Sequence, residues 1–103
     1  MRYVDDLIES NFRSLSQILQ LSIGQNHIVE ADIRQALVAE SLPLSENPHV
    51  HQLSASSESF ISKIMTSGDR DMLIIVKKIL KSVRYAVVTY YSVARVVPQN
   101  IPA

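Results

Sequence analysis

The fold is decided by residues 69–98, which read DRDMLIIVKKILKSVRYAVVTYYSVARVVP. The first half is amphipathic, with apolar side chains three or four positions apart, the spacing of one helix face. The second half, 84–96, is rich in β-branched and aromatic residues and on propensity alone suits a strand. No turn residue separates the halves, and a strand of about 15 residues far exceeds the usual length. We therefore predict one long helix from Asp69, ended by Pro98 because proline lacks a helical N–H.

A second long helix is predicted near the N-terminus, at about residues 4–23. Gly24 supplies the left-handed stop that often ends a helix. Asp6 and Glu9 have the spacing of a capping box, in which a carboxylate at the helix start and a Glu three residues later satisfy free N–H groups. The stripe that predicts this helix consists of Val4, Leu7, Ile8, Phe12, Leu15, Ile18 and Leu19.

Two shorter helices are predicted between the long ones. The first covers about residues 28–40, and Pro43 prevents it from continuing far. The second starts after Ser54 or Ser56, either of which has the hydroxyl that an N-cap needs, and it ends at Gly68.

The order of elements is long, short, short, long, which predicts an all-α fold. The 103 residues suit a single domain, a four-helix bundle over residues 1–103. Prolines and serines crowd residues 42–56, which we predict to be a mobile loop and a second contact surface. The tail 98–103 is expected to be extended and frayed.

The formal net charge is zero, but the charges are unevenly distributed. Residues 1–68 hold four basic and eight acidic side chains, a net charge of −4. Residues 69–103 hold six basic and two acidic side chains, a net charge of +4. We expect the two halves to attract each other, within one chain or across a dimer; the alternative is a basic surface for an acidic partner.

Composition also bounds the compartment and the chemistry. The chain has no cysteine, which excludes disulfides, thiolate metal sites and cysteine nucleophiles. No segment approaches the roughly 18 uninterrupted apolar residues of a membrane span. Asp5, Asp6 and Glu9 lie where a secretory signal has positive charge. We expect a soluble, cytoplasmic protein that does not contact membranes.

Residues 3–6 read YVDD, which resembles the YxDD motif of reverse transcriptases. In that family two neighbouring aspartates at the tip of a β-hairpin hold catalytic metal ions. Here Asp5 and Asp6 are followed by LIESNFRSLSQIL, a helical pattern with no return strand. We therefore interpret the two aspartates as acids near the positive end of a helix dipole.

Nothing in the sequence predicts an enzyme, a cofactor or a metal. Two isolated glycines cannot form a phosphate-binding loop, and no serine lies in a GxSxG turn. His49 and His51 could supply half of a metal site, but zinc normally takes three or four ligands, and only His27 is left among the histidines. We interpret the pair as polar loop residues.

The C-terminal helix carries more apolar surface than three other helices can cover. A helix that is apolar nearly all round is buried all round, and each large aliphatic side chain left in water forgoes roughly 1.5–3 kcal/mol. We therefore expect a non-catalytic, regulatory or adaptor subunit that homodimerises or binds an obligate protein partner through this helix. The interface residues predicted are Val87, Tyr90, Tyr91 and Val93.

The alternative function is a nucleic-acid-binding regulator. Its contacts would come from the basic side chains of the same helix, with tyrosines close behind them, because cations neutralise phosphates and aromatic rings stack on bases. The basic residues that would serve either nucleic acid or an acidic partner are Lys77, Lys78, Lys81 and Arg84.

Overall fold

The structure, a computed structural model, describes residues 2–19, 30–42, 52–65 and 70–100, with side chains up to Val93. Over these ranges the chain forms four helices and no strand, which confirms the predicted all-α four-helix fold. The helices are α1 (Arg2–Ile18), α2 (Glu30–Glu40), α3 (Ala55–Met65) and α4 (Arg70–Asn100).

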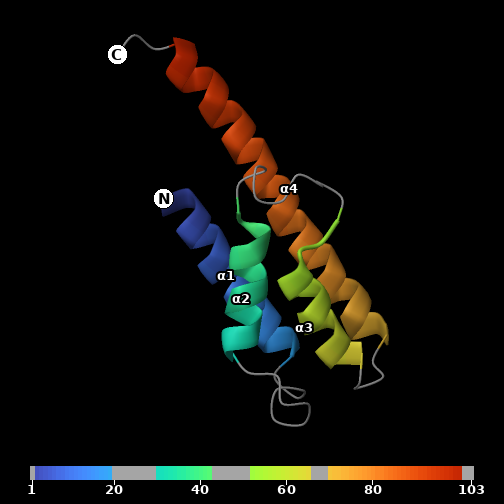
Figure 1. Cartoon of the computed structure of the whole chain (residues 1–103). Coiled ribbons are helices and arrows are strands. Elements are labelled where there is room, and N and C mark those ends of the chain that lie inside the picture. The colour runs from blue at the N-terminus through green and yellow to red at the C-terminus, as the bar shows by residue number, and fades with distance from the viewer. Residues whose placement is uncertain (1, 20–29, 43–51, 66–69, 101–103) are drawn as a thin grey trace.

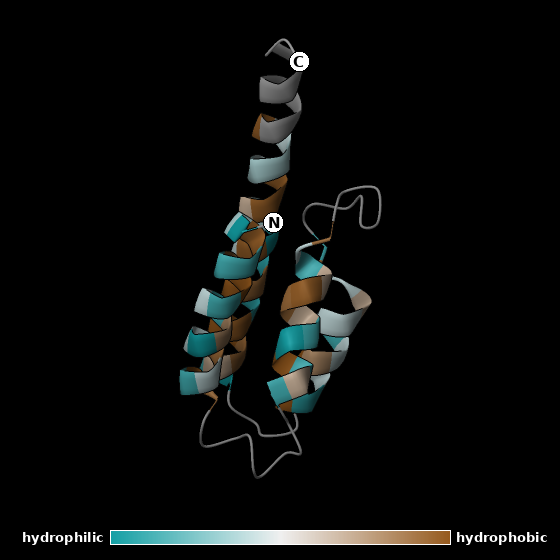
Figure 2. Ribbon diagram, turned by 90° about the vertical axis from the view of Figure 1, so that its left-hand side faces the viewer, coloured by the Kyte–Doolittle hydropathy of each residue, from teal (hydrophilic) through white to brown (hydrophobic). Residues whose placement is uncertain are grey.

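Successive helices run in alternating directions, up and down, as Figure 1 shows. Helices α1 and α4 lie side by side and form one layer, and α2 and α3 form the other (Figure 2). Helix α1 packs against α2 and α4, and α3 packs against α2 and α4. This arrangement is the up-down-up-down topology of a four-helix bundle.

The core lies between the two layers and takes aliphatic side chains from every described helix. In α4 the buried positions are three or four residues apart, so one stripe of the helix faces inward. Phe60 is the one aromatic ring among the fully buried described side chains. The core cluster consists of Leu15, Leu19, Ile33, Ala36, Leu37, Phe60, Ile61, Ile64, Val76, Leu80, Val83 and Val87.

Helix α4 confirms the choice of helix over strand for residues 84–96, which are helical throughout. The end predicted at Pro98 is wrong, because the helix continues to Asn100. Proline removes one backbone hydrogen bond, the one to the fourth residue before it. In the last turn that loss affects a single bond, so the helix can pass through it.

The capping box predicted at Asp6 and Glu9 is also wrong. Helix α1 begins at Arg2, so both carboxylates lie inside it. Val4 is already buried on the helix, so the apolar stripe of α1 begins before Asp6 and leaves no helix start there to cap. Asp6 instead forms a loose ion pair with Arg2, 4.0 Å away and one turn back.

Of the two serines predicted as alternative caps of α3, Ser54 and Ser56, the structure selects Ser54. The Ser54 hydroxyl accepts a hydrogen bond from the Ser57 N–H at 3.1 Å, the geometry of an N-cap. The predicted stops at Gly24, Pro43 and Gly68 lie outside the described residues.

Helices α1 and α2 are joined on the surface by Arg34. Its Nη1 donates to Oε1 of Glu9 at 2.6 Å, and the guanidinium lies over the Phe12 ring, 4.0 Å from its centroid. The hydrogen bond from Arg34 lowers the pKa of Glu9 below its usual value of 4.5, and the bond to Glu9 raises the pKa of Arg34. The contact therefore depends on the ionised form of Glu9.

We predict that Glu9→Gln makes the fold less sensitive to acid. Because the folded chain lowers the pKa of Glu9, the ion pair stabilises the fold above pH 4.5 and this stabilisation is lost as the pH falls through the lowered pKa. Urea unfolding at neutral pH and at about pH 3 measures the difference. In an Arg34→Gln background the same Glu9 substitution should have no further effect, and additive effects of the two variants would contradict the coupling.

Candidate functional site

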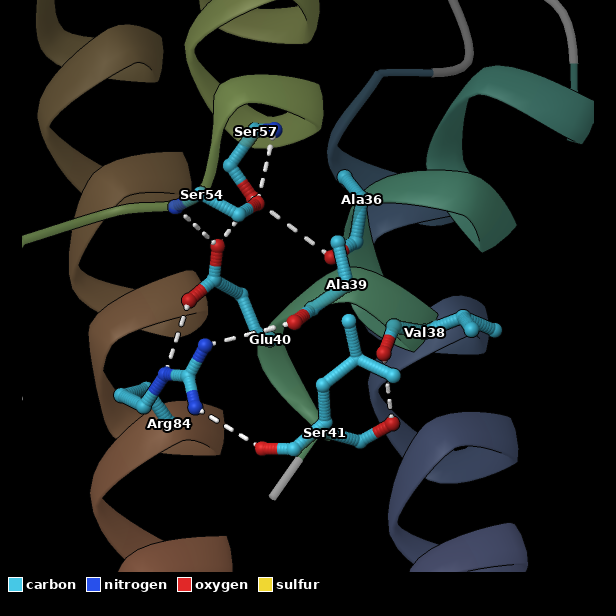
Figure 3. Close-up of polar contacts among 9 residues, drawn as sticks. Ala36, Val38, Ala39, Glu40, Ser41, Ser54, Ser57 and Arg84 are labelled. Carbon is cyan, nitrogen blue, oxygen red and sulfur yellow. Dashed lines mark hydrogen bonds and ion pairs between the residues drawn. The ribbon is translucent and has the colours of Figure 1, made fainter. Parts of the chain in front are cut away.

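Among the described residues two charged side chains are fully buried, Glu40 and Arg84, where the end of α2 meets α4. Glu40 is the last residue of α2, and Arg84 lies halfway along α4. Their side chains are 0% and 1% exposed, and Arg84 Nε donates to Glu40 Oε1 at 3.3 Å (Figure 3). Buried charges are rare unless they are paired, so this ion pair is a candidate functional site.

The guanidinium of Arg84 also caps the C-terminus of α2. Its Nη1 donates to the Leu42 carbonyl at 3.0 Å and its Nη2 to the Ala39 carbonyl at 3.3 Å. Ala39 belongs to the last turn of α2, where carbonyls lack helical partners, and its carbonyl also accepts from the Leu42 N–H at 3.4 Å. A cation at this position also favours the negative end of the α2 dipole.

The second carboxylate oxygen of Glu40 binds the start of α3. Oε2 accepts from the Ser54 N–H at 2.9 Å and from the Ser57 hydroxyl at 2.5 Å (Figure 3). The Ser54 hydroxyl in turn donates to Ser57 Oγ at 3.2 Å. The carboxylate thus lies at the positive end of the α3 dipole, where an anion is favoured.

The network has the chemistry of a structural joint. Both oxygens of Glu40 and all three nitrogens of the Arg84 guanidinium have partners in the chain. Ser57 donates its proton to a carboxylate, and within the described part of the chain no lysine hydrogen-bonds to it as a base for nucleophilic attack. Among the described residues no group of three or more histidines, cysteines or acids is placed to hold a metal ion.

We predict that Arg84→Met destabilises the fold by about 3–5 kcal/mol, because it leaves a carboxylate buried without its cation. Urea unfolding measures the loss. The double variant Glu40→Leu, Arg84→Met should lose less than the sum of the single variants, because no uncompensated charge remains. Lys81→Met, on the exposed side of the same helix, is the control and should stay within about 0.5 kcal/mol of wild type. Equal losses in Arg84→Met and Lys81→Met would contradict this assignment.

The four basic residues predicted to share one surface do not all lie on the surface of the molecule. Arg84 is buried in the ion pair with Glu40 and does not belong to an exposed basic face. Lys78 and Lys81 are exposed, and Lys77 is half-buried. Lys77 and Lys81 lie beside a surface hollow of about 430 Å³ between the start of α3 and α4; Gln52, Leu53 and Glu58 complete its lining.

The four residues predicted as an interface also differ in their exposure to solvent. Val87 is fully buried and belongs to the chain's own core, so it is not available to a partner. Tyr90 stacks on Tyr3 of α1 with ring centroids 4.5 Å apart and planes at 13°, and Tyr91 meets Tyr90 edge-on at 5.5 Å. Val93 is 57% exposed.

The solvent side of α4 carries further apolar side chains besides Val93. Ile75 is 45% exposed and Tyr85 is 64% exposed, with lysines and small polar residues between them. We call these exposed residues the outer face of α4. It comprises Ile74, Ile75, Lys78, Lys81, Ser82, Tyr85, Thr89, Ser92 and Val93.

Helix α4 is also much longer than the helix beside it. Its 31 residues span about 46 Å, against about 26 Å for the 17 residues of α1. Figure 1 shows the C-terminal end of α4 continuing past the start of α1. The stacking of Tyr90 on Tyr3 marks the level at which α1 begins, so roughly ten residues of α4, about 15 Å, extend beyond α1.

Other candidates give no site within the described residues. His27, His49 and His51 lie outside these ranges, as does most of the predicted loop 42–56. None of the described helices combines the length and the apolar character that crossing a bilayer requires. No family model matches the chain, and no curated protein or solved structure matches it. A functional conclusion therefore has to come from the surface of the molecule.

Proposed function

We propose that this chain is a non-catalytic interaction protein that self-associates through the outer face of α4. The observation that carries the proposal is the length of α4, which exceeds what the bundle covers. A helix in one small domain has no packing reason to extend about 15 Å past its neighbour. The same helix exposes Ile75, Tyr85 and Val93 along its solvent side.

The exposed apolar side chains favour a protein partner over a small ligand. They lie along one helix and do not line a cavity, whereas small-molecule sites are concave and mostly apolar. Covering a valine or isoleucine fully is worth roughly 1.5–3 kcal/mol. In a symmetric dimer the same side chain is buried in both copies, so the favourable free energy of burial is obtained twice. This suits a modest but specific association.

We predict that Val93→Arg weakens self-association by at least about tenfold, because it replaces an exposed apolar contact by a charge in both copies. Sedimentation over a range of concentrations measures the mass, which for the monomer is 11.6 kDa. Ser62→Arg, a neutral exposed position on α3 given the same charge, is the matched control and should sediment like wild type. A wild-type mass of 11.6 kDa at every concentration would remove the proposal.

A second function has a weaker basis in the structure. Lys78, Lys81 and the exposed ring of Tyr85 share the outer face of α4, and this combination of cations with an aromatic side chain suits a nucleic-acid backbone and its bases. The loss of Arg84 to the core leaves fewer cations than the sequence had indicated.

Binding to a labelled duplex at two salt concentrations separates the two functions. Each phosphate contact contributes about 0.9 to the magnitude of the slope of log affinity against log salt concentration. If the face binds nucleic acid, the double variant Lys78→Gln, Lys81→Gln should therefore reduce the magnitude of this slope by roughly 2. Absence of binding at low salt eliminates this second function and leaves self-association unaffected.

A further inference from the structure

We infer that the partner is a second copy of this chain, packed antiparallel across the layer of α1 and α4 about a two-fold axis at the level of Arg84. This inference rests on the proposed self-association and adds its geometry. It predicts which residues meet across the interface, Asp6 with the partner's Arg13 and Ile75 with the partner's Val93. The support comes from the way α1 and α4 are aligned within one chain.

The alignment of α1 and α4 is given by the stacking of Tyr3 on Tyr90. The two helices run in opposite directions (Figure 1) and rise equally, about 1.5 Å per residue. Moving one residue toward the C-terminus in α1 therefore corresponds to moving one residue toward the N-terminus in α4. Asp6 then lies at the level of Val87, and Arg13 at the level of Leu80.

The exposed side of α1 carries an acid and a base that suit an antiparallel copy. Asp6 and Arg13 are exposed, and they are seven residues apart, which places them on the same side of a helix. When an identical α1 runs antiparallel across this side, each Asp6 meets the partner's Arg13 if the axis passes midway between them. That midpoint lies at the level between Val83 and Arg84 of α4.

The apolar residues of α4 place the axis independently at the same level. Ile75 and Val93 are 18 residues apart, which is five full helical turns, so they lie on one line of the exposed side. In an antiparallel copy each Ile75 meets the partner's Val93 if the axis passes at Arg84. The two estimates of the axis differ by half a residue, less than about 1 Å along the helix.

The middle of this surface combines small side chains with the exposed ring of Tyr85, which lies next to the level of the axis. Ser10 of α1 and Ser82 of α4 are both exposed and lie close to the level of the axis. Small residues at a helix crossing allow the backbones to approach, and larger side chains at the two ends then close the contact. The surface is thus complementary to a copy of itself, as an interface about a two-fold axis has to be.

The area agrees with a dimer of moderate affinity. The line from Ile75 to Val93 is about 27 Å long, and two helices side by side cover about 20 Å in width. This corresponds to roughly 500 Å² from each copy, or about 1,000 Å² in total, near the lower limit for a specific interface. We therefore expect association in the micromolar range.

Disulfide trapping between two single-cysteine variants tests the arrangement, because the chain has no cysteine of its own. We propose to mix full-length Ile75→Cys with full-length Val93→Cys under mild oxidation and to separate the products by mass. The two positions are exposed, so neither variant should disturb the fold. A disulfide forms only when the two Cα atoms come within about 7 Å, and identical positions in the antiparallel pair are about 27 Å apart.

The expected result is a disulfide between the two variants, with little dimer when either variant is oxidised alone. Self-crosslinking of Val93→Cys would overturn the antiparallel arrangement but leave self-association in place. A dimer by sedimentation with no crosslink of any kind would overturn it as well. A wild-type protein that stays monomeric removes the proposed function together with this inference.

Charge variants test the contribution of α1 separately. Asp6→Arg and Arg13→Asp should each weaken self-association, because every ion pair across the axis becomes a like-charge pair. The double variant Asp6→Arg, Arg13→Asp should recover wild-type association, because each pair is restored in reverse. Ser62→Arg again controls for added charge away from the interface. Single variants that associate like wild type would remove Asp6 and Arg13 from the interface.

Discussion

The buried ion pair between Glu40 and Arg84 determines how three of the four described helices meet. One guanidinium binds the last carbonyls of α2, and one carboxylate binds the first N–H and hydroxyl groups of α3. Each charge is tolerated inside the bundle because the other charge and two helix ends surround it. These contacts require the end of α2, the start of α3 and the middle of α4 to lie at the same place in the bundle.

This joint also fixes the rotation of α4 about its own axis. With Arg84 inside, residues three, four or eight positions from it along α4, such as Val76, Leu80 and Val87, face the core as well. Side chains on the opposite side, Ile75 and Val93 among them, are then exposed. The apolar outer face is therefore a consequence of the buried pair, because turning the helix to cover it would expose Arg84 and leave Glu40 without its cation.

The elements were predictable from the sequence because their signals are local. Apolar residues at steps of three and four gave all four helices, and the absence of a turn in residues 84–96 was sufficient to choose helix over strand. The same kind of signal limited the cap of α3 to Ser54 or Ser56, and the structure selects Ser54. Helix ends were less certain, as Pro98 and the supposed capping box at Asp6 show, because tertiary packing can override a local preference.

The site was less predictable because its decisive contact is not local. Glu40 and Arg84 are 44 residues apart, and Arg84 follows three lysines along a helix that looks basic on one side. No pattern in the sequence distinguishes the one cation that turns inward. Val87 was misplaced for the same reason, since an apolar surplus indicates that some side chains stay exposed but does not identify them. The surplus itself was real, as the exposure of Ile75, Tyr85 and Val93 shows.

The end of α4 connects the fold with the proposed assembly. The segment 94–100 reads ARVVPQN, and valine and proline are poor helix formers, so intrinsic propensity does not explain a helix there. Helix α1 begins at Arg2, close to the level of Tyr91, and so does not run beside this end of α4. In the antiparallel arrangement the partner's α4 starts level with Pro98, because Arg70 and Pro98 are equally far from Arg84. A second copy would thus lie beside nearly all of the helix that one chain leaves uncovered, which accounts for a length that the bundle alone does not require.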